Sequence, residues 1–241
     1  MAGHSHWAGI KHKKGRQDKI RAKLFSKLSR EITVAAKLGA KDPESNPRLR
    51  TAIQLARQSN MPKDNIERAI NKSEANLNEN FQNLRYEGYG PFNVALIIET
   101  LSDNKNRSAS SIRTILSRNG GRLGENGSTK HLFFNCGIIQ VNRKALSDEE
   151  VLESAILFGA KDCKSFSNIH EIITEKEDFY KIKNLVETKT DSIKHTGIEW
   201  RPKSYIDLSK TQNEKIIKML EDLDEEDDIQ NTFTNCKLTI N

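Results

Sequence analysis

The side chains of this sequence best suited to chemistry are the cations near its amino terminus. Nine Lys and Arg residues stand against a single acid, Asp18, within the first thirty residues, which gives this segment a net charge of +8. The whole chain of 241 residues carries a net charge of only +6. Such a concentration of one sign is unfavourable through self-repulsion. It is typical of a protein that meets an anionic partner, most often a nucleic-acid backbone.

Within this segment, the residues from 10 to 16 are dense in cations and lack acids that would form pairs along a helix. Trp7 lies beside them, and an indole ring can stack on a base. No aromatic reading motif, zinc finger or heptad repeat is visible, so we expect backbone contacts that are sensitive to salt and weakly selective for sequence. The predicted nucleic-acid-binding residues are Trp7, Lys11, His12, Lys13, Lys14, Arg16, Lys19, Arg21 and Lys23.

Other reactive side chains do not assemble into a site. His4, His6 and His12 lack a Cys or an acid to complete a zinc site, and the neighbouring lysines would repel a dication. No set of nucleophile, base and orienting group can be put together, so the sequence predicts no catalytic residue, no metal, no cofactor and no enzyme. The three cysteines are odd in number and widely separated, which favours a reducing cytoplasm over a disulfide framework.

Near the other end of the chain, residues 221–228 (the acidic segment) hold seven carboxylates in eight positions. A metal cluster and a partner-binding patch are two interpretations. Such a run is more often a solvated helix end followed by a loop, and this is the interpretation that we favour. A further alternative is that the acidic segment competes intramolecularly for the basic amino-terminal arm.

Helical periodicity dominates residues 1–78, which carry a net charge of +10. One apolar stripe runs along a first helix through Ile20, Leu24, Leu28, Ile32, Ala35 and Leu38, and Gly39 is placed to end this helix in a left-handed conformation. Asn46 and Pro47 predict the start of a second helix, and Met61 with Pro62 leads into a third. We therefore expect a three-helix bundle.

Beyond a polar linker the pattern changes to strands. Strands are expected at 84–87, at 94–101 and near 130–134, with a helix at 107–118. Residues 138–200 follow the order βαββαβ, with a capping box at Ser147, and the tail is predicted as strand 204–208, helix 211–223 and strand 232–240. The predicted fold class is a multidomain α/β (α+β) protein. Its domains are 1–78 (basic arm and helical bundle), 79–136 plus 202–241 (discontinuous central α/β domain) and 137–201 (ferredoxin-like domain).

Four blocks of the chain resemble one known family in their order. They are MAGHSHWAGIKHKKGRQDKIRAKLFSKLSREITVAAKLG, NPRLRTAIQLARQSNMPKDNIERAI, YEGYGPFNVALIIETLSDNKNR and LEDLDEEDDIQNTFTN, and together they resemble the YebC family. The resemblance implies three domains, namely a helical bundle, a central domain and an inserted ferredoxin-like domain. It also implies a cytoplasmic DNA-binding transcriptional regulator. A mitochondrial relative acts as a translational activator of cytochrome oxidase, and bacterial members have been connected to the ribosome.

The chain departs from the family at one turn, where the usual Gly-Pro-Gly-Gly-Val is replaced and Pro91 is followed by Phe92, Asn93 and Val94. The missing glycines leave the backbone shape of this turn open. Two functions remain: regulation of transcription through DNA, which leads, and a translation factor that docks on ribosomal RNA through the same basic arm. A protein adaptor that uses the acidic segment trails both. The apolar runs are too short to span a bilayer, and the sequence does not indicate an oligomeric state.

Overall fold

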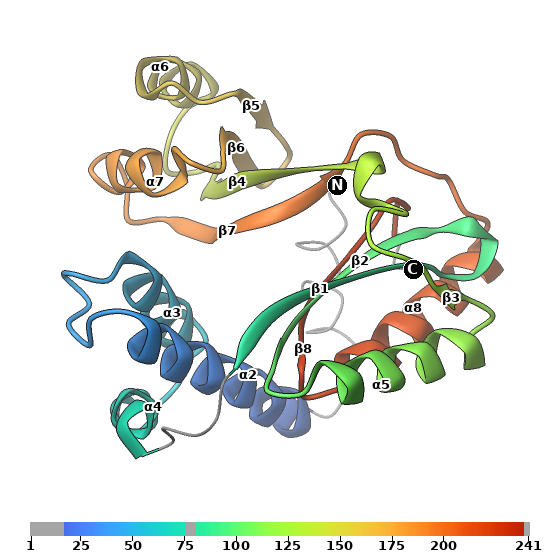
Figure 1. Cartoon of the computed structure of the whole chain (residues 1–241). Coiled ribbons are helices and arrows are strands. Elements are labelled where there is room, and N and C mark those ends of the chain that lie inside the picture. Colours follow the sequence, from blue (N-terminus) through green and yellow to red (C-terminus); the bar gives the residue numbers. More distant parts are fainter. Residues whose placement is uncertain (1–16, 76–80, 239–241) are drawn as a thin grey trace. The chain divides into compact units, whose positions relative to one another are not determined.

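The computed structural model describes residues 17–75 and 81–238 (Figure 1). The chain forms two compact units. One comprises the chain up to residue 130 together with residues from 206 onward, and the other comprises residues 131–205. The fold is mixed α/β with two four-stranded antiparallel sheets, which confirms the predicted class. No helix in the described part of the chain is long and apolar enough to cross a membrane.

The first unit begins with three helices: α2 (Gln17–Leu38), α3 (Pro47–Gln58) and α4 (Lys63–Ala75). Their common core is made of apolar side chains at helical spacing, among them Ile32, Leu49, Ile53 and Ile66. α3 begins as predicted, because the Asn46 side chain accepts a hydrogen bond from the Leu49 N–H at 3.1 Å and Pro47 is its first residue. The amphipathic pattern therefore predicted the bundle correctly.

The end of α2 differs from the prediction. Leu38 is 66% exposed, so it lies outside the buried stripe, and Gly39 does not adopt a positive φ. Gly39 is needed for space instead, since a Cβ there would lie 2.7 Å from Nδ2 of Asn46. That amide donates to the carbonyls of Ala35 (2.9 Å) and Ala40 (2.7 Å). The glycine therefore lets the cap of α3 also satisfy the last carbonyls of α2.

The first sheet has the strand order β3-β1-β2-β8, formed by β1 (Gln82–Tyr89), β2 (Ala95–Ser102), β3 (Arg122–Leu123) and β8 (Ile229–Thr234). Helices α5 (Lys105–Arg118) and α8 (Lys210–Asp224) lie side by side against one face (Figure 1). The predicted strand at 204–208 is wrong. Only Ile206 of that segment exchanges backbone hydrogen bonds with residues 235 and 237, so a single bridge forms.

The turn between β1 and β2 is a short 3-10 helix, Pro91–Asn93. Phe92 and Asn93 have φ values of 62° and 57°, in the left-handed region that glycine adopts without a steric penalty. For residues with a Cβ this conformation costs on the order of 1 kcal/mol each. The turn therefore keeps a backbone shape that suits glycine, although the family's glycines are absent from it.

The second unit is built from β4 (Phe133–Asn142), α6 (Asp148–Phe158), β5 (Asp162–Ser165), β6 (Ile169–Glu175), α7 (Phe179–Glu187) and β7 (Ile193–Pro202). Its sheet has the order β5-β6-β4-β7, so the first strand lies between the third and the fourth. This is the ferredoxin-like arrangement, which confirms the predicted βαββαβ order. Ser147 caps α6 through the predicted capping box with Glu150.

β4 is one continuous strand, whereas the sequence predicted two, near 130–134 and at 138–141. Residues Lys130–Leu132 form a 3-10 turn, and the strand then runs without a break through Gly137. A Cβ at Gly137 would lie 2.3 Å from Oγ1 of Thr174 and 2.6 Å from the ring of Phe179. The glycine thus marks a close approach by α7 rather than a strand end. The three-domain division stays a prediction, and its boundary at residue 136 falls inside β4.

We expect residues 131–205 to fold as an isolated fragment. A shorter fragment, 137–201, lacks the strand residues that pair with Glu199–Pro202, including the buried Phe133 and Cys136. Removing two buried side chains costs several kcal/mol, so its melting temperature should be lower by about 10 °C or more. Thermal melts followed by circular dichroism measure the melting temperatures of the two fragments. A 131–205 fragment without a cooperative transition would contradict the expectation.

Candidate nucleic-acid interface

The helix α2 follows directly on the basic arm and carries further cations along its length. Lys23, Lys27 and Arg30 recur at spacings of four and three, so they share one face of the helix. Only 8% of the surface of Lys27 is exposed, which is unusual for a lysine without a charged partner. This face therefore requires nearby acceptors.

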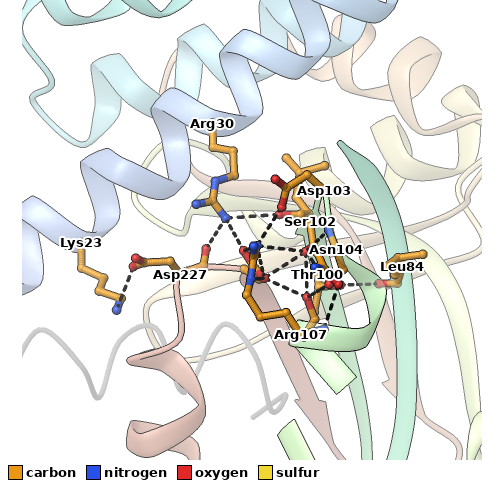
Figure 2. A network of polar contacts seen from close by, with 12 residues as sticks. Lys23, Arg30, Leu84, Thr100, Ser102, Asp103, Asn104, Arg107 and Asp227 are labelled. Carbon is orange, nitrogen blue, oxygen red and sulfur yellow. Dashed lines mark hydrogen bonds and ion pairs between the residues drawn. The ribbon is translucent and has the colours of Figure 1, made fainter. Parts of the chain in front are cut away.

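The acidic segment supplies those acceptors. The ammonium group of Lys27 lies 2.7 Å from a carboxylate oxygen of Asp224, and that of Lys23 lies 3.2 Å from Asp227. Lys23 also donates to the carbonyl oxygen of Glu225. The Nη1 atom of Arg30 donates to the carbonyl oxygen of Asp227 at 2.7 Å and to the Asp228 carboxylate at 3.0 Å (Figure 2). The chain thus neutralises this face of α2 with its own acids.

Asp228 is the centre of this network. Its Oδ2 atom accepts hydrogen bonds from the hydroxyls of Ser102 (2.9 Å) and Ser108 (2.8 Å), and Arg107 reaches both carboxylate oxygens. Figure 2 shows the donors Arg30, Ser102 and Arg107 converging from α2, β2 and α5. Burial alone raises the pKa of Asp228, but the hydrogen bonds from Ser108, Arg107 and Ser102 outweigh it and hold the pKa below its usual value.

The interpretation of the acidic segment therefore needs a correction. α8 ends at Asp224 and a loop follows, as expected for a helix end. The segment is not simply solvated, however, because Asp228 is buried and bonded. No three His, Cys, Asp or Glu side chains in residues 17–75 and 81–238 come together as a metal site would need. An intramolecular contact with basic residues exists, and in the described residues it involves α2.

An adjacent face of α2 borders an open pocket with a volume of about 490 Å³. Its other walls are α4 and Phe81. Three cations line it, namely Arg30 from α2 and Arg68 and Lys72 from α4, and none of its lining residues is an acid. Arg68 and Lys72 therefore meet at a pocket none of whose described lining residues is an acid, whereas Arg30 is already paired with Asp228.

The structure places only some of the predicted binding residues. Trp7, Lys11, His12, Lys13, Lys14 and Arg16 lie outside the described residues, and Lys19 lies in α2. Arg21 is exposed, whereas the ammonium group of Lys23 is occupied by the acidic segment. A phosphate that used Lys23 would have to displace Asp227. The assignment of these nine residues to nucleic-acid binding stays a prediction.

The sequence reasoning missed Arg30, Arg68 and Lys72 as candidates. The first lies 38 residues or more before the other two, so only the packing of α4 on α2 brings them to one pocket. One signal was available, because Arg68 and Lys72 stand four residues apart on α4, away from the buried Ile66 and Ala69. That spacing indicates a second basic stripe on the bundle.

Comparison with known proteins finds similarity over nearly the whole chain. Residues 5–76 match the family described as TACO1/YebC protein N-terminal domain, and residues 81–236 match that described as TACO1/YebC second and third domain. The chain is 50% identical to a probable transcriptional regulatory protein of Pelagibacter ubique (strain HTCC1062), over all of both chains. It is 43% identical to a conserved hypothetical protein of Aquifex aeolicus of known crystal structure, with a TM-score of 0.85 over 98% of each chain.

Replacing Asp228 by Asn should lower the free energy of unfolding at pH 7 by about 2–4 kcal/mol, because charged hydrogen bonds are removed and the guanidinium groups of Arg30 and Arg107 lose their shared carboxylate. The folded pKa of Asp228 is lowered, so its contribution is present above the unfolded value near 3.8 and is lost as the pH falls through the folded pKa. The difference between wild type and variant should therefore shrink toward pH 3.

Urea denaturation at pH 7 and at pH 3 measures this difference. Glu221→Gln is the matched control, since Glu221 is an exposed acid of the same segment and should change stability by less than about 0.5 kcal/mol. An Asp228→Asn variant as stable as this control at pH 7 would contradict the central role of Asp228.

Proposed function

We propose that this chain, which belongs to the TACO1/YebC family, is a non-enzymatic nucleic-acid-binding protein that regulates transcription by binding DNA in the cytoplasm. The name of the Pelagibacter ubique relative, a probable transcriptional regulatory protein, supports the regulatory part of the proposal. That relative matches this chain over its full length, so the same domains are present in both.

The observation that carries the proposal is the distribution of charge. Residues 1–78 hold a net charge of +10, although the whole chain holds only +6. The structure shows that the chain neutralises one face of α2 internally, Arg30 included, while Arg68 and Lys72 line the pocket beside it, where none of the described lining residues is an acid. A cationic surface that the protein leaves without counter-charges is what a polyphosphate backbone binds, with release of condensed counterions.

Contacts with the backbone rather than with base edges are expected to dominate. A duplex reader usually lays a helix in the major groove with Arg, Asn or Gln side chains aimed at the bases. On the described surface of α2, Arg21 is exposed and could reach a base edge. Lys23 and Lys27, which follow it along the helix, are paired with carboxylates of the acidic segment. The proposal therefore assigns binding to phosphate contacts, which position a protein on DNA without reading its sequence.

One histidine, His170, is not placed to act as a general base, which agrees with the non-enzymatic part of the proposal. His170 is fully buried, and its two ring nitrogens are hydrogen-bonded to the Ser165 hydroxyl (2.8 Å) and the Leu146 carbonyl (2.9 Å). A general base must reach a substrate proton, and a ring sealed inside the second unit does not. His170 instead joins the loop before α6 to β5 and β6.

Replacing Lys11, Lys13, Lys14 and Arg16 together by Ala should weaken binding to duplex DNA. It should also reduce the slope of log K against log salt by about 0.9 for each phosphate that the variant no longer neutralises. The matched control removes four exposed lysines from the second unit: Lys144, Lys176, Lys181 and Lys189. Fluorescence anisotropy across a salt series measures both variants. Equal slopes for the two variants would place the binding site elsewhere on the chain.

Discrimination between DNA sequences should be small, at most about 1–3 kcal/mol, which is the cost of one mismatched pair. The measurement is a competition titration at one salt concentration with a promoter duplex, its scramble and ribosomal RNA. Similar affinities for both duplexes, at or above that for the RNA, would support the proposal. Much tighter RNA binding would favour a translation factor instead, and a thousandfold promoter preference would show that base contacts rather than phosphate contacts dominate.

A further inference from the structure

The pocket between α2 and α4 has the chemistry of an oxyanion site. Arg68 and Lys72 line it from α4, and Ser26 and Ser29, which carry hydroxyl groups, line it from α2. Hydroxyl groups and cationic side chains are the donors that proteins use to hold phosphate oxygens. Because none of the described lining residues is an acid, the described walls attract an entering anion.

The walls of the pocket are held in place by hydrogen bonds that use the Thr33 hydroxyl and one nitrogen atom each of Arg68 and Arg30. The Thr33 hydroxyl donates to the Ala69 carbonyl at 2.8 Å and so fixes α2 against α4. Arg68 uses its Nε atom on the Asp64 carbonyl at 3.2 Å, which leaves its terminal nitrogens for a ligand. Arg30 is anchored at Nη1 by Asp228. The cations are therefore positioned before a ligand arrives, which lowers the entropic cost of binding.

One wall is planar and apolar. The guanidinium group of Arg30 lies over one face of the Phe81 ring, with 5.5 Å between the guanidinium carbon and the ring centroid. Aromatic rings and guanidinium planes are the surfaces on which proteins stack unpaired bases. The volume of about 490 Å³ lies within the range of sites for small organic ligands, and such sites are larger than a lone phosphate needs.

From these features we propose that the pocket binds one nucleotide unit, with its phosphate on Arg68 and Lys72 and its base against Phe81. The inference rests on the proposed function where the nucleotide belongs to a bound strand. The same chemistry would accept a free nucleoside monophosphate. In a strand, the pocket takes an unpaired nucleotide, because a paired base is stacked inside the duplex and cannot reach Phe81.

The test compares two double variants of the full chain. Arg68→Gln with Lys72→Gln removes two cations of the pocket, and Arg57→Gln with Lys63→Gln removes two exposed cations of the same bundle outside it. A third variant, Phe81→Leu, removes the ring alone. Thermal melting checks that each variant folds. The probes are a single-stranded DNA 12-mer, deoxyadenosine 5′-monophosphate, deoxyadenosine and inorganic phosphate, each titrated at one salt concentration.

We expect the pocket double variant to bind the 12-mer about tenfold more weakly than the control double variant does. Phe81→Leu should weaken binding of the 12-mer and of the monophosphate by about fivefold or more, and leave inorganic phosphate unchanged. Equal 12-mer affinities for the two double variants, with no dependence of monophosphate binding on Arg68 and Lys72, would overturn the inference.

The outcome is separable from that of the proposed function. If replacing the basic arm weakens DNA binding while the pocket variants match their control, the proposed function stands and the pocket inference fails. If the wild-type protein binds no strand but binds the monophosphate through Arg68, Lys72 and Phe81, the proposed function fails and the pocket stands as a site for a free nucleotide.

Discussion

The carboxylate of Asp228 joins parts of the chain that lie between 120 and 198 residues from it in sequence. It receives hydrogen bonds from the end of β2 and the start of α5, and it pairs with Arg30 of α2. A buried carboxylate is tolerated only where donors compensate for the water that it has given up. Each of these donors therefore constrains the others, and Arg30 ties α2 to the first sheet both through Asp228, just before β8, and through the Leu101 carbonyl of β2.

This constraint decides which cations of the bundle stay available. Lys23, Lys27 and Arg30 are bound by the acidic segment, so a large part of the positive charge along α2 has a structural use. Arg68 and Lys72 lie on α4 and line the pocket that α4 forms with α2. None of the described lining residues of this pocket is an acid. A net charge summed over residues 1–78 does not reveal this division, because it counts paired and available cations alike.

Local features of the sequence predicted the elements well, and long-range contacts explain the misses. The Asn46 cap and the capping box at Ser147 are decided by neighbours within three residues, so they could be found by inspection. Gly137 meets α7, some forty residues later in the chain, so neighbouring residues did not indicate that one strand runs through it. The pairing of Lys27 with Asp224 spans 197 residues. The basic pocket was missed for the same reason, since its cations meet only when α4 packs on α2.

A phosphate would gain different net electrostatic energies on the two faces of α2, namely the face of Lys27 and the face that borders the pocket. The Coulomb energy of two opposite unit charges 4 Å apart is roughly 4 kcal/mol for an effective dielectric constant near 20, before the cost of removing them from water is subtracted. On the face of Lys27, a phosphate must first displace a carboxylate that already provides such an interaction, so its net gain is small. At the pocket, the bond of Arg68 to the Asp64 carbonyl uses Nε, and no described carboxylate has to be displaced from its terminal nitrogens. Salt also screens the half-buried Lys27 pair less than an exposed contact. Salt that releases a bound polyanion should therefore leave α2 attached to the acidic segment.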